Sequence, residues 1–247
     1  MAEPATATPT PAEAPVPRPA PPAPAPARKG EVLPGLTARQ IAGLAAAVLV
    51  AQLPFAVYFL RGEAATTVEI GGQQGFSDDF EREALGPNYF ATGGHWRIEK
   101  GVLHSPGSKN NPLWLKARLP DDVAVEFDVR SESAEGDIKC EIFGNGRDHA
   151  SGYVVLFGGW SNSTSALARL DEHGRDRKEN RTLKVTRGKT YHFRVQRKGT
   201  LLQWFADGNL MMEWDDPAPL KGSGHDRFGF SSWEADLYFD NLKVTAL

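Results

Sequence analysis

The amino-acid sequence predicts an all-β sandwich of two antiparallel sheets, placed after one transmembrane helix. Three observations support this fold class: short apolar runs that alternate with polar residues, turn signals between these runs, and no helical periodicity over ten residues beyond Gly72. Ten or more strands at this spacing in roughly 175 residues are typical of two sheets packed face to face.

The alternation is clearest in VAVEFDV, which begins at Val123, and it continues in GDIKCEIF; SGYVVLFGG predicts a buried strand between glycines. The stretch TYHFRVQRKGTLLQWFADGNLMMEW predicts three strands joined by tight turns at Lys198-Gly199 and Asp207-Gly208. An Asp-Gly pair between apolar runs is a strong hairpin signal. RFGFSS and DLYFDNLKVTA predict the two closing strands.

Composition divides the chain into four segments: a disordered Pro/Ala-rich tail (1–40), a transmembrane helix (41–60), a linker (61–71) and the β domain (72–247). The tail has too little apolar surface to offset the entropy of ordering it. The run Ile41–Leu60 holds 20 residues without a charge, which is the length of a helix that crosses the ~30 Å hydrocarbon core of a bilayer. A cleaved signal peptide fits less well, because the apolar run is too long and starts too late in the chain.

The charges beside this run predict its orientation. Arg28, Lys29 and Arg39 precede it, and only Arg61 follows closely. The positive-inside rule therefore places the tail in the cytoplasm and the β domain outside. The Ala/Pro-rich composition indicates a bacterial host, so we expect a single-pass signal-anchor protein of the inner membrane with its domain in the periplasm or beyond.

Composition also limits the partners. The segment after Arg61 carries more Asp and Glu than Lys and Arg, which argues against nucleic acid and leaves neutral sugars open. The single cysteine, Cys140, excludes an intramolecular disulfide and a zinc site built on several cysteines. The alternation of DIKCEIF places this thiol on an apolar face, where it acts as a small buried hydrophobe rather than as a nucleophile.

The β segment resembles concanavalin A-like jelly-roll domains of the laminin-G and glucanase type. The resemblance rests on DDFEREALGPNYFATGGHWRIEKGVLHS at its start, the meander 188–214, and the closing RFGFSSWEADLYFDNLKV. In layout it is most similar to the 3-keto-disaccharide hydrolase family, except that GDIKCEIFGN replaces a strand rich in Gly, Ser and Asn. The resemblance implies a jelly-roll fold, and it says little about activity, because one fold hosts many functions.

The stretch VEFDVRSE also resembles the Glu-x-Asp-x-x-Glu strand of laminarinase- and lichenase-type glycosidases. That resemblance implies Glu126 as nucleophile and Asp128 as its helper. The acid would then fall at Ser131, whereas Glu132 lies one residue later.

The residues themselves favour another interpretation of VEFDVRSE. Arg130 lies between Asp128 and Glu132 on one face, and a cation there favours charged carboxylates, whereas a general acid must keep a proton. The opposite face is apolar throughout. We therefore expect an ordinary strand with an inward Val/Phe face and an outward ladder of ion pairs, and Glu126 and Asp128 as catalytic residues only if the chain is an enzyme.

Metal and cofactor chemistry has little support in the sequence. The six histidines show no zinc-type spacing, and no phosphate loop or dinucleotide motif is present. Asp79 and Asp240 lie at the two ends of the β domain, and the first and last strands of jelly rolls are often neighbours. Their oxygens could hold a structural Ca²⁺; the plainer interpretation is polar residues at turns and strand ends.

The tryptophans give the best indication of a binding site. Trp96, Trp204 and Trp214 fit core positions, and Trp114 could face either way. Trp160 opens the polar loop SNSTS, which contains Asn162, and Trp233 lies in SSWEAD, which ends before Leu237 and contains Asp236. A loop tryptophan with nearby amide, hydroxyl and carboxylate groups suits stacking on a sugar ring. We predict ligand binding by Trp160, Asn162, Trp233 and Asp236; the alternative is that each ring only caps the sandwich.

Three functions fit these observations. The first is a membrane-anchored, non-catalytic module that binds a glycan or cell-wall polysaccharide, the second is a cell-envelope glycoside or 3-keto-glycoside hydrolase, and the third is a structural partner domain of an envelope complex. The lack of a convincing acid/base pair favours the first, for which we expect no cofactor.

Overall fold

The computed structural model describes residues 69–70 and 73–247, together with four isolated residues, Gln40, Ala42, Val48 and Gln52. Its contacts divide the chain into two compact units, Met1–Gly62 and Glu63–Leu247. The predicted tail except Gln40, and the predicted span except Ala42, Val48 and Gln52, lie outside the described residues. In the part of the chain that is described, no helix has both the length and the apolar character needed to cross a membrane.

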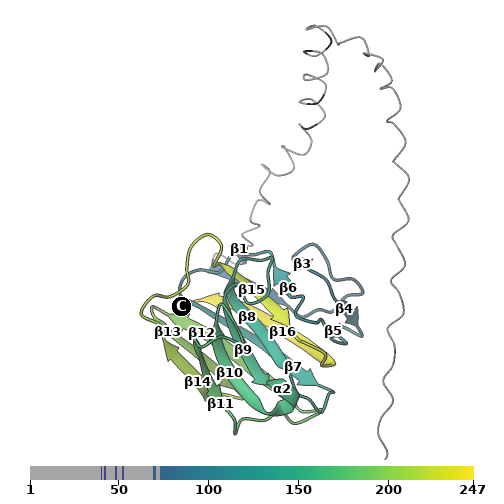
Figure 1. Ribbon diagram of the computed structural model, residues 1–247. Coiled ribbons are helices and arrows are strands. Elements are labelled where there is room, and N and C mark those ends of the chain that lie inside the picture. The colour runs from purple at the N-terminus through teal and green to yellow at the C-terminus, as the bar shows by residue number, and fades with distance from the viewer. Residues whose placement is uncertain (1–39, 41, 43–47, 49–51, 53–68, 71–72) are drawn as a thin grey trace, which may run out of the picture. The chain divides into compact units, whose positions relative to one another are not determined.

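The described part of the second unit contains strands and one short turn of helix, α2 (Figure 1). The elements are β1 (Glu69–Ile70), β2 (Gln73–Asp78), β3 (Tyr89–Ala91), β4 (Arg97–Glu99), β5 (Val102–Ser105), β6 (Leu113–Leu115), β7 (Val123–Ser131), β8 (Ile138–Gly144), β9 (Tyr153–Gly158), α2 (Gly159–Asn162), β10 (Thr164–Arg169), β11 (Arg177–Asn180), β12 (Thr190–Lys198), β13 (Leu201–Ala206), β14 (Asn209–Asp215), β15 (Arg227–Ser231) and β16 (Leu237–Ala246).

These strands form two sheets. The nine-stranded sheet has the order β1-β2-β16-β7-β12-β13-β14, with β5 paired to β16 and β4 paired to β5. The seven-stranded sheet has the order β11-β10-β9-β8-β15-β6-β3. All pairings between the described strands are antiparallel. The predicted all-β architecture of two antiparallel sheets is confirmed, and β2 pairs with β16 as expected of the first and last strands.

The core lies between the two sheets and is rich in phenylalanine. Val125, Phe127 and Val129 of β7 are buried on one face, as their alternation predicts. The Phe127 ring lies 5.8 Å from Phe228 and 5.2 Å from Phe230 between ring centres, and both partners belong to the opposite sheet. Cys140 is buried in the same core, where loss of water raises the pKa of its thiol, so the prediction of a small buried hydrophobe is confirmed.

Two turns and one loop can be compared with the positions that the local sequence patterns predicted for them. Asp207 and Gly208 both have positive φ, 51° and 76°, and join β13 to β14 as the Asp-Gly signal predicts. The preceding turn lies one residue later than predicted, because Lys198 still pairs with Leu201. The predicted polar loop SNSTS is partly wrong: Thr164 already belongs to β10 and is buried, as is Ser165, whose hydroxyl is satisfied by backbone groups of Gly158 and Leu183.

The tryptophans assigned to the core pack there: Trp204 is fully buried, and Trp96 and Trp214 are partly buried against it. Trp114 faces the other side of its sheet. Its ring lies so close to Gly144 and Gly229 that a Cβ at either position would approach it to 2.3 or 2.8 Å. These two glycines therefore make room for a large ring on the outer face of the seven-stranded sheet.

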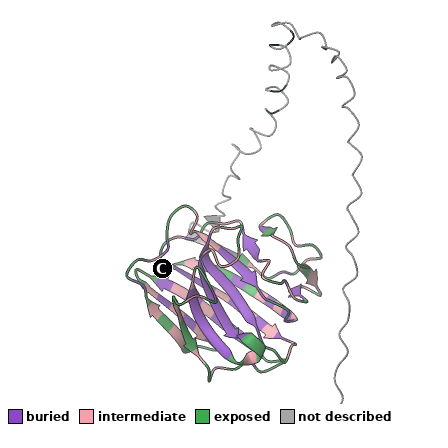
Figure 2. Cartoon of the chain, in the orientation of Figure 1, coloured by how far each residue is buried: buried purple, intermediate pink, exposed green. Residues whose placement is uncertain are grey.

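That outer face is unusually well covered. The central strands β8 and β9 are buried at every residue, whereas the edge strands β11 and β14 are largely exposed (Figure 2). One face of β8 and β9 packs on the core, so loops must cover the other. These loops form the site described next.

Candidate functional site

A cavity of about 720 Å³ lies on the outer face of the seven-stranded sheet. Ile138, Cys140 and Ile142 of β8 point into the core, so Lys139 points outward and reaches the cavity floor with Leu156 of β9. The walls come from loops that are far apart in the sequence. The residues that matter for the site are Asn110, Glu135, Asp137, Lys139, Trp160, Glu172, His173, Trp233 and Glu234.

Trp160 is presented by a backbone turn of unusual conformation. Trp160, Ser161 and Asn162 have φ values of 49°, 58° and 57°, a left-handed region that L-residues seldom occupy. Asn162 holds this turn: its amide donates to the Val185 carbonyl at 2.8 Å and accepts from the Val185 N–H at 2.9 Å. The Trp160 ring is 39% exposed, with the Arg177 guanidinium 5.2 Å from its centre and His173 against it.

Trp233 lies on another wall and is 48% exposed. Its backbone N–H donates to the Asp137 carboxylate, and its carbonyl accepts from the Lys109 N–H at 2.7 Å. Asp137 in turn donates its own N–H to the Gly158 carbonyl at 2.9 Å, at the start of the Trp160 turn. One residue, Asp137, thus ties the two tryptophan-bearing segments together. It is 9% exposed, and this burial raises the pKa of its carboxyl, against the opposing effects of Lys139 and the Trp233 N–H.

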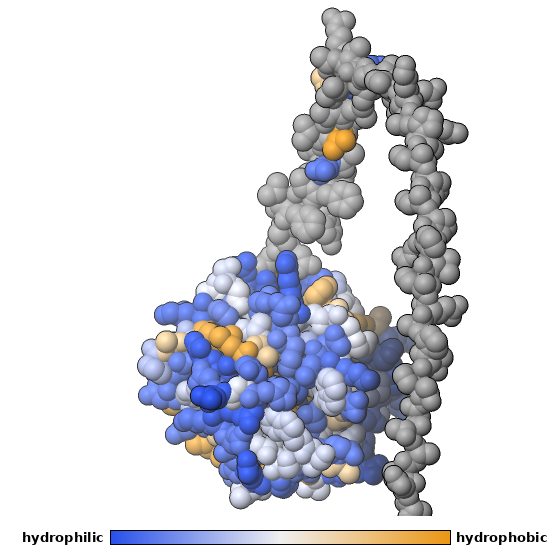
Figure 3. Space-filling model, viewed as in Figure 1, coloured by the Kyte–Doolittle hydropathy of each residue, from blue (hydrophilic) through white to orange (hydrophobic). Residues whose placement is uncertain are grey.

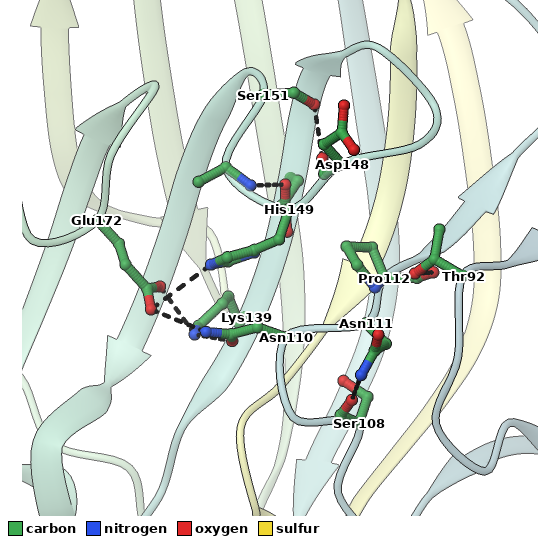
Figure 4. A network of polar contacts seen from close by, with 12 residues as sticks. Thr92, Ser108, Asn110, Asn111, Pro112, Lys139, Asp148, His149, Ser151 and Glu172 are labelled. Atoms are coloured by element: carbon green, nitrogen blue, oxygen red, sulfur yellow. Dashed lines mark hydrogen bonds and ion pairs between the residues drawn. The ribbon is translucent and has the colours of Figure 1, made fainter. Parts of the chain in front are cut away.

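A charged network lies at the base of the cavity (Figure 4). The Lys139 ammonium lies 2.8 Å from the Glu172 carboxylate and donates to the Asn110 side chain at 2.8 Å. His149 contacts Glu141 at 2.6 Å and Glu172 at 3.5 Å. These five side chains come from one strand and three loops. Two buried atoms of the network, His149 Nε2 and Glu172 Oε2, make ion-pair contacts but no hydrogen bond.

The network raises the pKa of His149 and lowers the pKa of Glu172. Burial alone would lower the pKa of His149, but the carboxylates of Glu141 and Glu172 outweigh it and raise that pKa to about 9. Burial alone would raise the pKa of Glu172, but His149 and Lys139 outweigh it and lower that pKa to about 2. Both groups are therefore charged near neutral pH, and the network is held by full ionic charges.

The structure brings some of the predicted ligand residues together and separates others. Trp160 and Trp233 line the same cavity, and Asn162 shapes the turn that carries Trp160. Asp236 does not line this cavity; its carboxylate lies 2.5 Å from His104 Nε2, beside a ring stack of His104 on Tyr238. Sequence reasoning missed Asp137, Lys139 and Glu172. The charged alternation of DIKCEIF could have indicated Asp137 and Lys139, but nothing local points to Glu172.

Glu126 and Asp128 lie elsewhere, on the outer face of the nine-stranded sheet. Glu126 forms an ion pair with Arg194 at 3.0 Å, and Asp128 contacts His192 at 2.8 Å. The predicted outward ion pairs are thus present, and two of them run across to β12. Arg130 pairs along the chain with Glu132 at 2.8 Å, whereas Asp128 pairs with the cross-strand His192 instead of with Arg130.

The two calcium candidates lie near each other, since β2 and β16 are paired. Burial raises the pKa of Asp240, and the nearby charges of Asp128, Glu81 and Asp79 raise it further. Among the described residues, however, no group of three or more His, Cys, Asp or Glu side chains is arranged to hold a metal ion. The calcium site stays a prediction.

Comparison with known proteins identifies the fold. No protein-family model matches the sequence, and no curated protein is similar to it. Among solved structures, a carbohydrate-binding module CBM66 from Bacillus subtilis is similar with a TM-score of 0.53 and 16% identity, covering 66% of this chain and 98% of its own. The Emp47p carbohydrate recognition domain has a TM-score of 0.51 and 13% identity, with 72% and 99% covered.

A laminarinase from Flavobacterium sp. UMI-01 has a TM-score of 0.51 and 10% identity, and the match covers 69% of this chain and 98% of the laminarinase. At such low identity these similarities establish the fold alone. The β unit therefore has the two-sheet antiparallel sandwich fold of these structures, which are named as a carbohydrate-binding module, a carbohydrate recognition domain and a laminarinase. Membership of the 3-keto-disaccharide hydrolase family stays a prediction.

Proposed function

We propose that this chain is a membrane-anchored, extracytoplasmic module that binds a glycan without cleaving it, in the cavity between Trp160 and Trp233. One observation carries the proposal: two half-exposed indole rings line a single cavity that amide and carboxylate side chains also line. Flat apolar rings suit the faces of sugars, and fixed polar groups suit their hydroxyls. The names of the similar carbohydrate-binding structures support the same assignment.

The face of the described surface that Figure 3 shows has no stronger candidate for a binding site. The described surface in Figure 3 is mostly hydrophilic, and its apolar residues form small separate patches. A large apolar patch would instead indicate a protein or lipid partner.

Truncation of either tryptophan tests the site. We expect Trp233→Ala in the full chain to weaken glycan binding by at least about 30-fold, the factor that corresponds to the ~2 kcal/mol typical of an aromatic hot spot. Trp160→Ala should act in the same direction. Binding to a glycan array and thermal melting are the measurements, and stability should fall by less than about 1 kcal/mol because both rings are half exposed.

Leu210→Ala is the matched control, since Leu210 is also 48% exposed but lies on β14, away from the cavity. It should leave glycan binding unchanged. Undiminished binding after both tryptophan substitutions would place the glycan elsewhere. Loss of several kcal/mol of stability would mark the ring as part of the core.

The anchor is tested by topology. Its support is the uncharged run Ile41–Leu60 and the excess of basic residues before it. In a bacterial host, alkaline phosphatase fused after Leu247 should be active, and a reporter that works only in the cytoplasm should be inactive there. The reverse pattern, or full-length protein in the soluble fraction, would contradict the anchor.

Hydrolysis is the second candidate function, and one observation favours it. In the same cavity the pKa of Asp137 is raised and that of Glu172 is lowered, which is the pattern of an acid beside a carboxylate base or nucleophile. The ion pair with Lys139 and the bond from the Trp233 N–H give both carboxylates structural roles, so binding remains the better assignment.

A panel of chromogenic glycosides separates the candidates. Turnover that Asp137→Asn and Glu172→Gln abolish would establish a hydrolase, whereas binding without turnover supports the module. Neither binding nor turnover would favour the third function, a structural partner domain of an envelope complex.

A further inference from the structure

The charge of the cavity wall restricts the ligand that the site can take. Lys139 is the one lysine among the described lining residues, but it is only 2% exposed, and its ammonium is already held by Glu172 and Asn110. A ligand carboxylate, sulfate or phosphate would have to break these contacts. The base of the cavity is therefore closed to anions.

The carboxylates of the wall are less well compensated. Glu172 is neutralised by Lys139 and His149, but Glu135, Asp137 and Glu234 also line the cavity. Glu234 has only Lys109 near it, at 3.9 Å, with both side chains in water. Glu135 is exposed and has no ion pair or side-chain hydrogen bond among the described residues. The wall thus carries a negative excess that attracts a cation.

Asp137 is the carboxylate of this wall that is best placed to bind a cationic group of a ligand. It is more than nine-tenths buried, and the Trp233 N–H donates to Oδ2. Its other oxygen, Oδ1, accepts no hydrogen bond from any described residue. Oδ1 is not among the fully buried side-chain atoms that lack a partner, so it stays accessible in a residue that lines the cavity. A charged donor that arrives through the cavity can therefore bond to it, and such a bond is stronger than one between neutral groups.

The indole of Trp233 and the Asp137 carboxylate line the same cavity, and the Trp233 backbone N–H is bonded to Asp137. The ring has no aromatic or cationic neighbour among the described side chains, whereas the Trp160 ring already has Arg177 over it. The face of an indole attracts cations, and it also stacks on sugar rings. The Trp233 ring is therefore available to stack on a ligand, whereas the Trp160 ring already has the Arg177 guanidinium over it.

We infer that the cavity selects an amino sugar with a free, protonated amino group, whose ring stacks on Trp233 while its ammonium donates a hydrogen bond to Asp137 Oδ1. The inference rests on the proposed function and names the chemical class of its ligand. N-acetylation would remove the positive charge, and a uronate would add a negative charge beside the carboxylates.

The test compares three tetramers with the full chain by isothermal titration at mildly acid pH: glucosamine, N-acetylglucosamine and galacturonate. The glucosamine tetramer should bind at least about 10-fold more tightly than the N-acetylated one, as expected for a charge-assisted hydrogen bond to a buried carboxylate. The galacturonate tetramer should bind weakest. Added salt should reduce the preference only in part, because the contact is buried.

Asp137→Asn should abolish the preference for the free amine while it still accepts the Trp233 N–H. Glu135→Gln, at an exposed position that cannot disturb the fold, should reduce the preference in part. Asp215→Asn is the matched control, because it removes the same charge at an exposed residue of β14 that does not line the cavity. It should leave the preference unchanged.

Equal or tighter binding of the N-acetylated or galacturonate tetramer would overturn the inference. An equal loss of the preference for the free amine in Asp137→Asn and Asp215→Asn would also overturn it, because it would show a general attraction of a polycation to an acidic protein. If glycans bind and Trp233→Ala abolishes their binding, but the free amine gives no advantage, the inference fails and the proposed function stands. If no glycan binds at all, the proposed function fails as well.

Discussion

Phe127→Ala should destabilise the β sandwich by about 3–5 kcal/mol, the usual cost of deleting a buried phenylalanine ring. Phe127 is fully buried at the centre of the core. Its ring lies 5.4 Å from Phe193 in its own sheet and 5.2 Å from Phe230 in the other. The substitution would remove contacts that hold the two sheets together and leave a cavity between rings that cannot easily collapse. Chemical denaturation of the full chain is the measurement.

The neighbours of Phe127 in sequence provide the control. Glu126→Gln and Asp128→Asn alter the outward face of the same strand, where each carboxylate is partly exposed and paired across to β12. Such pairs contribute only about 0–1 kcal/mol each, so the unfolding midpoint should barely move. A loss below about 1 kcal/mol for Phe127→Ala would contradict the core assignment. A hydrolytic activity that disappears in either carboxylate variant would restore the glycosidase interpretation of this strand.

Lys139→Met should cost about 3–5 kcal/mol, because it leaves a buried carboxylate without its main counter-charge. The Lys139 ammonium and the Glu172 carboxylate lie 2.8 Å apart, and both side chains are almost inaccessible to water. Methionine has nearly the same length and shape, so little packing is lost and the effect reports on charge. Lys109→Met is the matched control: this lysine is exposed, and its replacement should change stability by less than about 0.5 kcal/mol.

The double variant Lys139→Met/Glu172→Gln should recover much of this loss, since it removes both buried charges together. Replacement of a whole buried ion pair is often neutral, whereas removal of one partner is costly. The two single effects should therefore differ strongly from additivity in denaturant unfolding. Additive effects would mean that the two groups do not stabilise each other and that water reaches both of them.

Much of the fold could be predicted from local patterns, and the site only in part. The alternation of β7 predicted its buried and exposed faces correctly, because the pleat puts successive side chains on opposite sides wherever the strand lies in the sheet. The Asp207-Gly208 pair predicted its turn because few other residues accept positive φ at both positions. Trp160 and Trp233 were found because a large aromatic ring outside an apolar run is a visible anomaly.

The contacts of the charged residues were not predictable in this way. Asn110, Lys139 and Glu172 meet only because two loops fold over β8, and alternation alone would leave Lys139 on a face open to water. The same limit applies to Asp236, which a short distance in sequence placed beside Trp233. The structure turns its carboxylate toward His104 instead.

The sequence by itself determined most of the long strands, the inward faces of β7 and β8 and the positions of the two exposed tryptophans in the sequence, since these depend on backbone geometry and on residues within a few positions of one another. Only the tertiary structure decided that the two rings share one cavity, that Asp137 joins their segments, and that the outward charges of β8 are buried. These features depend on sequence-distant loops folding over one sheet. The free energy of each charge is set by the neighbours that this packing supplies, and no local pattern contains them.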